Sequence, residues 1–157
     1  LMLEIGSAYP HTELSVIAGV TAASSGAAVL GAPLGHDFCS VRLSDLLTPW
    51  ETIEKRLRAA AEGDFVIVLY NPSSHKRKDY LKKACRILLR SVEGDRVCGY
   101  VENIGRDGTK AEICTLEELQ DREVSMFTTV FIGNSGSEVI DGRFVTKRGY
   151  QCDKFPH

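Results

Sequence analysis

The alternation of apolar and polar positions predicts a chain of alternating strands and helices. Residues 65–70, Phe-Val-Ile-Val-Leu-Tyr, form a continuous apolar run, which is typical of a strand buried on both faces of a parallel or mixed sheet. Because helices separate most of the predicted strands, the pattern favours an α/β lobe with a mixed sheet flanked by helices. The other predicted strands are residues 14–17, 38–43, 96–103, 110–114 and 128–132.

Helix starts are predicted where capping residues precede apolar periodicity. Thr48 is predicted as an N-cap followed by Pro at the first helical position, and this helix should run to about Ala61 and end at Gly63. A second helix is expected at about residues 75–91, and Thr115 opens a short third helix with a capping box. Turn signals at residues 106–108 and 141–142 predict two hairpins.

Residues 17–38 are dominated by small side chains. Such residues allow tight packing of a helix on a sheet, or close approach of a polar or anionic ligand to free N–H groups at a helix start, and the pattern leaves both open. Residues 14–35 also lack Asp, Glu, Lys and Arg and are long enough to span a bilayer. Pro33 and the interspersed Gly, Ser and Thr residues argue against a spanning helix, so no membrane partner is expected.

Composition narrows the functional class. A net charge of −2 argues against a general nucleic-acid binder. Five dispersed cysteines without a CxxC pair favour the reduced thiols of a cytoplasmic protein over a disulfide framework or a metal site. Residues 1–5 indicate the end of a helix stopped by Gly6 and Pro10, so we expect part of a larger protein upstream.

Three loops that follow predicted strands are rich in Gly, Asn, Ser and Thr: residues 19–25, 70–74 and 133–135. Open α/β sheets bind ligands beyond the carboxyl ends of their strands, so we expect these loops to line one site. They offer hydrogen bonds and close backbone approach but no acid–base pair. The catalytic residues therefore stay unknown.

Basic residues at the start of the second predicted helix conflict with the helix dipole. Residues 75–78 are His-Lys-Arg-Lys, and cations in a first helical turn cost roughly 0.3–1 kcal/mol each. An anionic ligand would resolve this conflict, whereas a solvated basic face is the alternative interpretation. His36, beside Asp37, is a further candidate, with a structural role as its alternative.

Six stretches, in order along nearly the whole chain, carry a family resemblance. They are residues 19–23 (Gly-Val-Thr-Ala-Ala), 31–38 (Gly-Ala-Pro-Leu-Gly-His-Asp-Phe), 43–50 (Leu-Ser-Asp-Leu-Leu-Thr-Pro-Trp), 70–72 (Tyr-Asn-Pro), 103–106 (Asn-Ile-Gly-Arg) and 126–135 (Met-Phe-Thr-Thr-Val-Phe-Ile-Gly-Asn-Ser). Together they resemble the tetrapyrrole methylases of cobalamin biosynthesis. The resemblance is greatest to the enzymes that methylate C-17 of precorrin-3B or cobalt-precorrin-3.

The resemblance implies methyl transfer from S-adenosyl-L-methionine to C-17 of a corrin precursor, with ring contraction. It implies two α/β lobes with the donor between them, residues 1–45 being a remnant of the N-terminal lobe and 46–157 the C-terminal lobe. By this resemblance, the expected cofactor-binding residues are Thr21, Ala22, Tyr70, Asn71, Asn103, Ile104, Gly105, Gly133 and Asn134. The expected substrate-binding residues are His36, Ser74, His75, Lys76 and Arg77. The basic residues would suit a substrate ringed by carboxylates, and a homodimer is expected.

Two departures from the family pattern affect the expected activity. Ala18 stands where the family usually has Pro, and the glycine-rich loop and Gly-Asp-Pro segment of the N-terminal lobe have no counterpart here. With half of the donor site, this chain should show little or no activity alone, because such transfer depends on holding donor and acceptor in line. The alternatives are a superfamily methylase acting elsewhere on a corrin or on RNA, and a non-catalytic binding or dimerisation module.

Overall fold

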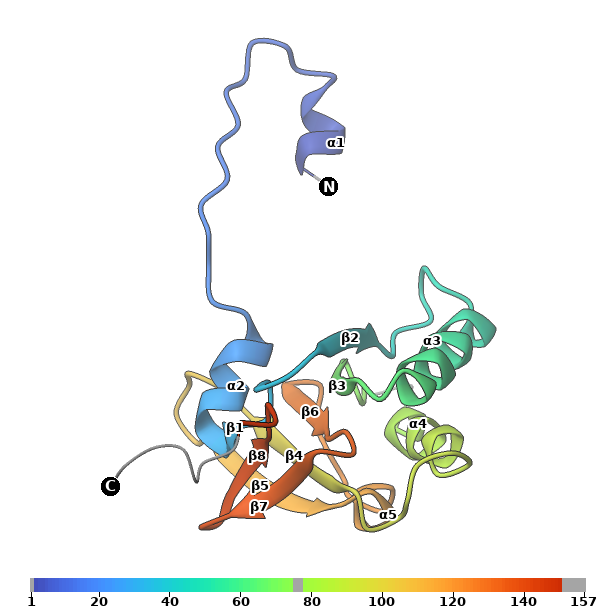
Figure 1. The fold of residues 1–157 in the computed structure, drawn as a ribbon. Coiled ribbons are helices and arrows are strands. Elements are labelled where there is room, and N and C mark those ends of the chain that lie inside the picture. The colour runs from blue at the N-terminus through green and yellow to red at the C-terminus, as the bar shows by residue number, and fades with distance from the viewer. Residues whose placement is uncertain (1, 75–77, 151–157) are drawn as a thin grey trace, which may run out of the picture.

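The computed structural model describes residues 2–74 and 78–150. A five-stranded sheet lies at the centre of this part of the chain, with strand order β2-β3-β6-β4-β5. β2 is parallel to β3, whereas each of the other neighbouring pairs is antiparallel, so the predicted mixed sheet is confirmed (Figure 1). The strands are β2 (Phe38–Arg42), β3 (Val66–Tyr70), β6 (Thr128–Ile132), β4 (Val97–Glu102) and β5 (Lys110–Thr115).

A smaller sheet of three strands lies beside the first within the described residues. β8 (Arg143–Thr146) is its middle strand, parallel to β1 (Gly31–Ala32) and antiparallel to β7 (Ser137–Ile140). Gly31 is required where β1 meets β8, because its φ is +134° and a Cβ atom there would lie 2.8 Å from the Phe144 carbonyl oxygen. Both predicted hairpins, β4–β5 and β7–β8, are confirmed.

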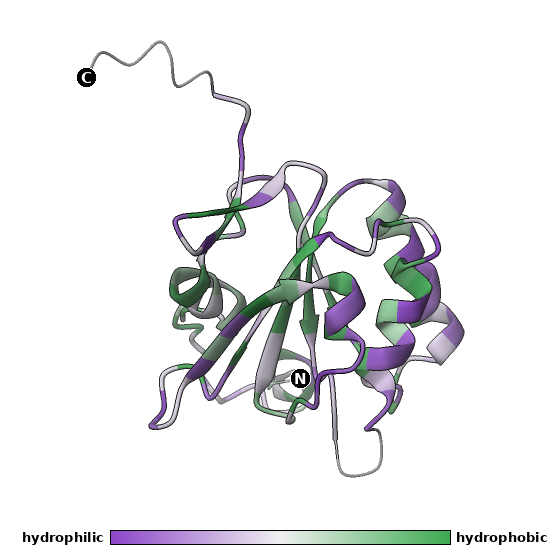
Figure 2. Cartoon of the chain, turned by 90° about the horizontal axis from the view of Figure 1, so that it is seen from below, coloured by the Kyte–Doolittle hydropathy of each residue, from purple (hydrophilic) through white to green (hydrophobic). Residues whose placement is uncertain are grey.

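Helices cover both faces of the central sheet (Figure 1). One face packs against α3 (Trp50–Glu62), α4 (Tyr80–Leu88) and α5 (Leu116–Leu119), and the other against α2 (Ala22–Leu30) and β8. Successive side chains of a strand point to opposite faces, which explains why β3 is apolar throughout. Figure 2 shows the same pattern, with largely hydrophobic central strands between helices that carry both hydrophobic and hydrophilic residues.

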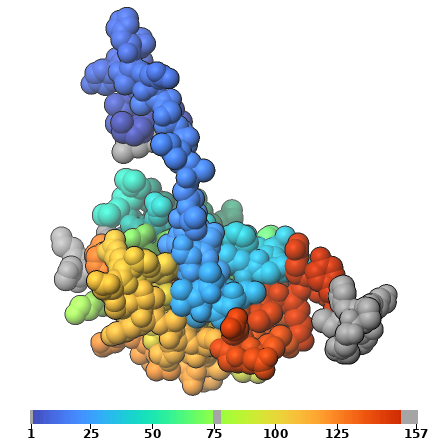
Figure 3. Space-filling view, turned by 90° about the vertical axis from the view of Figure 1, so that its left-hand side faces the viewer, coloured from blue at the N-terminus to red at the C-terminus, as the bar shows by residue number. Residues whose placement is uncertain are grey.

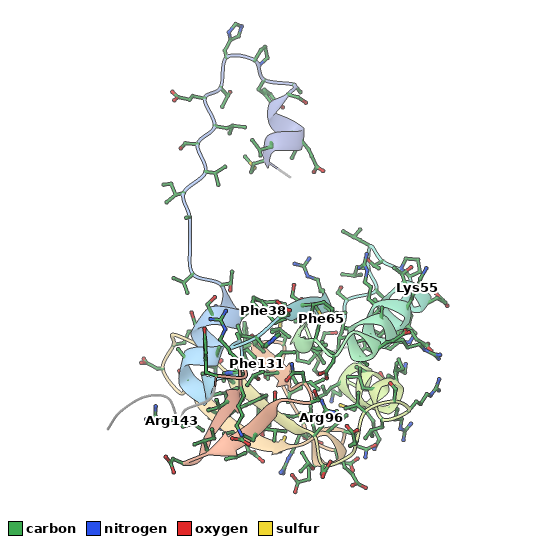
Figure 4. The ribbon with its side chains drawn as sticks, in the orientation of Figure 1. Phe38, Lys55, Phe65, Arg96, Phe131 and Arg143 are labelled. Carbon is green, nitrogen blue, oxygen red and sulfur yellow. The ribbon has the colours of Figure 1, made fainter. Side chains whose placement is uncertain are left out.

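The small residues of α2 serve close packing. A Cβ atom at Gly26 would lie 2.9 Å from the Phe131 ring and 3.0 Å from Ile104 Cδ1, and Ala23 and Ala27 are buried against the same cluster. Phe131 lies between α2 and the sheet (Figure 4). The packing interpretation of this segment is therefore confirmed, while a ligand-binding role of its first residues stays a prediction.

The predicted capping of α3 is wrong. Pro49, not Thr48, occupies the N-cap position, with no side-chain hydrogen bond. The N–H groups of Thr52 and Ile53 donate to the Pro49 carbonyl, so the helix begins one residue later than predicted. Its end at Gly63 is as expected. The capping box at Thr115 is confirmed.

The predicted start of α4 is also wrong. The helix begins at Tyr80 with Asp79 at the N-cap, and Lys78 lies before it in a turn. Asp79 pairs with Lys83 one turn later at 2.8 Å, so this N-terminus has an acidic residue that suits the helix dipole. Lys78 therefore does not lie in the first turn of the helix, contrary to the prediction. The other three predicted residues, 75–77, lie outside the described residues. The buried residues of this helix are Leu81, Ala84, Cys85, Ile87 and Leu88.

Residues 2–21 extend away from the rest of the chain. They consist of α1 (Met2–Gly6) and an extended segment, which rises as a narrow column in the space-filling view (Figures 1 and 3). The strand predicted at residues 14–17 is wrong for this structure, because none of the described strands pairs with the segment and a lone strand is not stable in water. Residues 22–45 pack with the later residues, and a domain boundary at residue 45 stays a prediction.

Candidate functional site

One edge of the central sheet gathers the ends of two strands that run in the same direction. β3 and β4 are each antiparallel to β6, which lies between them, so Asn71 and Asn103 follow their carboxyl ends at the same edge. Strand spacing places these residues about 10 Å apart. Both have a φ of 55°, a left-handed conformation that Asn adopts more readily than most other residues. We call this region the Asn71 edge.

The N-terminus of α2 is attached to this edge. Thr21 is the N-cap, and its hydroxyl accepts a hydrogen bond from the Ser24 N–H at 3.2 Å. The Ala23 N–H donates to the Tyr70 hydroxyl at 3.0 Å, which connects the first turn of α2 to the end of β3. Four residues predicted to bind the cofactor, Thr21, Ala22, Tyr70 and Asn71, are therefore neighbours in space.

The loop after β4 joins the same group. The Asn103 N–H donates to the Phe127 carbonyl at 3.2 Å, and the Thr109 hydroxyl donates to the Asn103 carbonyl at 2.9 Å, which closes the loop. Ile104 packs against α2, whereas Gly105 has a φ of +71° and open space around its Cα. The structure thus brings Asn103, Ile104 and Gly105 to the Asn71 edge as well.

Two buried hydroxyls at this edge lack hydrogen-bond partners among the described residues. They are Ser74 Oγ, in the loop after β3, and Thr128 Oγ1, at the first position of β6. A buried hydroxyl without a partner is destabilising and marks a place where a ligand or water could bond. Sequence reasoning identified Ser74 but missed Thr128, because the apolar pattern around Thr128 indicated only a buried strand.

Gly133 and Asn134 lie at the opposite edge of the sheet. β6 runs antiparallel to β3 and β4, so its carboxyl end lies beside their amino ends, and the Gly133 N–H donates to the Val97 carbonyl at 2.8 Å. The expectation that three loops line one site is therefore wrong for residues 133–135. A cofactor-binding role of Gly133 and Asn134 stays a prediction. We call this region the Asn134 edge.

The polar groups of the Asn134 edge bond to one another. Asn134 Oδ1 accepts from the Gly136 N–H at 3.0 Å and from the Ser137 hydroxyl at 3.2 Å. The Ser135 N–H donates to Asp64 Oδ1 at 2.8 Å. Partial burial would raise the pKa of Asp64, but the hydrogen bonds from Ser135 and the charge of Arg96 outweigh it, so this pKa lies below its usual value.

His36 lies at the Asn134 edge, away from Ser74, the other predicted substrate-binding residue that the structure describes. It lines a cavity of about 360 Å³ together with Asn134 and Lys147, and its Nδ1 accepts a hydrogen bond from the Asp37 N–H at 2.8 Å. Ser74 instead lines a cavity of about 400 Å³ near the Asn71 edge. His75, Lys76 and Arg77 lie outside the described residues.

The cysteines offer no activated nucleophile in the described part of the chain. Cys39, Cys85, Cys98 and Cys114 are free thiols, and burial raises the pKa of Cys85 to about 12 and that of Cys114 to about 11. Over the same residues, no cluster of three or more His, Cys, Asp or Glu side chains has the arrangement of a metal site. No helix among them has the length and apolar character needed to cross a bilayer.

The chain is similar to a known family of enzymes. The sequence profile of the tetrapyrrole (corrin/porphyrin) methylases matches residues 1–120. The chain belongs to the tetrapyrrole methylase family. This membership confirms the resemblance seen in the sequence.

Curated relatives of this tetrapyrrole methylase chain carry related names. It is 43% identical over 151 residues to the probable cobalt-factor III C(17)-methyltransferase of Salmonella typhimurium, covering 96% of this chain and 63% of the relative. It is 40% identical over 133 residues to the precorrin-3B C(17)-methyltransferase of a Sinorhizobium species, covering 85% of this chain and 52% of the relative. The chain thus spans roughly half to three-fifths of these two relatives.

Solved structures confirm the fold. The crystal structure of the methyltransferase CobJ superposes with a TM-score of 0.84 at 34% identity, covering 93% of this chain and 62% of CobJ. The cobalt precorrin-4 methyltransferase CbiF superposes with a TM-score of 0.64 at 17% identity, covering 84% of this chain and 57% of CbiF, a similarity that concerns the fold alone.

Proposed function

We propose that this chain contributes to S-adenosyl-L-methionine-dependent methylation at C-17 of a precorrin-3B-type corrin precursor, with ring contraction, in cobalamin biosynthesis. The observation that carries the proposal is the identity of 40–43% to the two C(17)-methyltransferases over most of this chain. The whole-enzyme activity is a proposal because the chain spans less than two-thirds of each relative.

The Asn71 edge is our proposed place for the methyl donor. Three separate segments meet there, held by the Ala23–Tyr70 and Asn103–Phe127 hydrogen bonds. They contain the residues that the family resemblance assigns to the cofactor: Thr21, Ala22, Tyr70, Asn71 and Asn103–Gly105. S-adenosylmethionine would supply the methyl group. The left-handed conformations of Asn71 and Asn103 turn the chain at the two strand ends beside which the donor would lie.

The chain's own contribution would be positioning rather than acid–base chemistry. Methyl transfer accelerates when the methyl group, its leaving group and the acceptor carbon are held in line and water is excluded. The apolar packing of α2 on Phe131 and Ile104 makes one side of the Asn71 edge rigid, which suits that role. We assign no general base. We further propose that the chain alone holds part of the donor site and has little or no activity.

Cytoplasmic location and homodimer formation belong to the same proposal. The free thiols at the four described cysteines support a reducing compartment. The homodimer rests on the family resemblance, and sedimentation of the purified chain would test it.

Calorimetric titration with S-adenosylhomocysteine, the demethylated donor, tests the proposal. We expect weak binding by the 157-residue chain and tight binding by a version extended upstream, followed by C-17 methylation of cobalt-factor III or precorrin-3B by the long version. Tight binding by the short chain would refute the partial-site proposal. An absence of binding by both versions would contradict the donor assignment, and a non-catalytic binding module would then be preferred.

A further inference from the structure

Two cationic side chains line a cavity beside the Asn71 edge, and neither is among the site residues that the family resemblance assigns. It measures about 400 Å³ and lies between the loop after β3 and the segment that connects α5 to β6. Lys78 and Arg122 line it, together with the hydroxyl residues Ser73, Ser74 and Ser125. Met126 and Phe127 add apolar surface, each about half exposed at 51%.

The two cationic side chains differ in their ion-pair partners. Arg122 Nη2 pairs with Glu112 Oε1 at 2.7 Å, and the Tyr100 hydroxyl donates to the other oxygen of Glu112 at 2.6 Å, so the guanidinium is held in position. Lys78 has no carboxylate within ion-pairing distance in residues 2–74 and 78–150. Glu123 also lines the cavity and opposes binding of an anion, and the charge of Lys78 offsets it.

A buried hydroxyl adds a second, independent observation. Ser74 Oγ is buried at this cavity and bonds to none of the described residues, which costs stability unless a bound group accepts or donates there. A carboxylate oxygen accepts hydrogen bonds from both ammonium and hydroxyl groups. The apolar Met126 and Phe127 would contact the hydrocarbon part of the same ligand.

The cavity adjoins the proposed donor site. Ser73 and Ser74 follow Asn71 in the chain, and the Phe127 carbonyl accepts the hydrogen bond of the Asn103 N–H. An anionic group in the cavity would therefore lie close to a methyl donor at the Asn71 edge. The Arg106 guanidinium lies 4.9 Å from the centre of the Phe127 ring and fixes this aromatic side chain at the boundary between the two sites.

We propose that this cavity binds a carboxylate-bearing side chain of the macrocyclic substrate, with Lys78 as the main cation, Ser74 as a hydrogen-bond donor and Arg122 as a second, positioned cation. This inference rests on the proposed function for the kind of substrate and adds the residues that would orient it. The ligand chemistry is a flexible acetate- or propionate-type carboxylate attached to a flat, largely apolar ring.

Fluorescence titration with uroporphyrin III, whose pyrrole rings each carry acetate and propionate groups, tests the pocket. We expect Lys78→Gln to weaken binding by about tenfold and Glu123→Gln to strengthen it by about threefold, because the substitutions remove opposite charges from one cavity. Lys55→Gln is the matched control, since Lys55 is an exposed lysine on α3 that does not line the cavity (Figure 4). A porphyrin with cationic N-methylpyridinium groups should not show the Lys78 dependence.

Ser74→Ala separates ligand binding from folding. Because the buried Ser74 hydroxyl lacks a described partner, its removal should leave thermal stability unchanged or slightly raised while weakening uroporphyrin binding by about threefold. A variant that unfolds more easily and binds equally well would overturn the assignment of this hydroxyl to the ligand.

S-adenosylhomocysteine titration of the same variants distinguishes the two proposals. If the chain binds S-adenosylhomocysteine but Lys78→Gln and Lys55→Gln bind uroporphyrin like the wild type, the carboxylate pocket is refuted and the donor assignment stands. If uroporphyrin binding depends on Lys78 while S-adenosylhomocysteine binds neither the 157-residue chain nor the version extended upstream, the pocket stands and the donor assignment fails. Absence of uroporphyrin binding by the wild-type chain refutes the pocket.

Discussion

The two edges of the central sheet have similar residues but differ in how their polar groups are used. At the Asn134 edge, Asn134 and Ser135 form hydrogen bonds with neighbouring loop residues and with Asp64. At the Asn71 edge, the buried hydroxyls of Ser74 and Thr128 lack partners among the described residues. A loop whose polar groups are satisfied stabilises the fold, whereas unsatisfied groups beside a cavity are available to a ligand. The composition of a loop therefore does not by itself indicate a site.

The largest difference between the edges should appear at their glycines. A Cβ atom at Gly133 would lie 2.5 Å from Ser137 Cβ and 2.8 Å from the Val97 carbonyl oxygen, so Gly133→Ala should destabilise the chain by about 2–3 kcal/mol. The methyl group added by Gly105→Ala would lie in open space. Only the left-handed backbone, with a φ of +71°, should lower the free energy of unfolding, by about 1 kcal/mol. Urea denaturation measures both. Equal losses would contradict the close packing at the Asn134 edge.

Tyr70→Phe tests the attachment of α2 to the Asn71 edge. Loss of the hydrogen bond from the Ala23 N–H should lower the free energy of unfolding by about 1–2 kcal/mol, because Tyr70 is half-buried at the helix start. S-adenosylhomocysteine binding should also weaken, as measured by calorimetry. Thr146→Val, which removes a hydroxyl bonded to Ser137 Oγ at 2.7 Å, is a control expected to lower stability without changing donor affinity. Unchanged donor affinity in Tyr70→Phe would argue against the proposed site.

Two serines provide a matched comparison of the edges. Ser135→Ala removes a hydroxyl that donates to Asp64 and should lower the free energy of unfolding by about 1 kcal/mol. Ser74→Ala removes a buried hydroxyl without a described partner and should leave that free energy unchanged or slightly raised. Thermal denaturation of both variants would decide. A larger loss at Ser74 would mean that the Asn71 edge satisfies its own polar groups too.

Acid should weaken the Asn134 edge slightly. The pKa of Asp64 is lower in the folded chain than the value of about 3.9 in an unfolded chain, so its stabilising contribution is present above that pH and is lost as the pH falls through the folded pKa. Asp64→Asn should flatten this acidic limb of the stability curve, by about 1 kcal/mol or less because Asp64 is half exposed. An unchanged pH dependence in this variant would show that other carboxyl groups cause the acid limb.

Local sequence signals predicted most elements of the fold. The apolar run of β3, the Thr115 capping box and the turn signals of both hairpins depend on residues close together in sequence, and all appear in the structure. The errors concern boundaries and partners. The N-caps at Pro49 and Asp79 were decided by backbone hydrogen bonding and by the Asp79–Lys83 pair. Residues 14–17 lack a neighbouring strand among the described residues, which a β-strand requires.

The candidate site, too, was predicted in part from the sequence and decided in part by the tertiary structure. Family motifs in the sequence were enough to select Thr21, Tyr70, Asn71 and residues 103–105, and the structure shows that they are neighbours. The sequence alone determined the family, the alternation of strands and helices, and the small-residue surface of α2. Only the tertiary structure decided that β6 runs antiparallel to β3 and β4, which places Gly133 and Asn134 at the far edge. Strand direction depends on pairing between residues distant in sequence, and no local pattern encodes it.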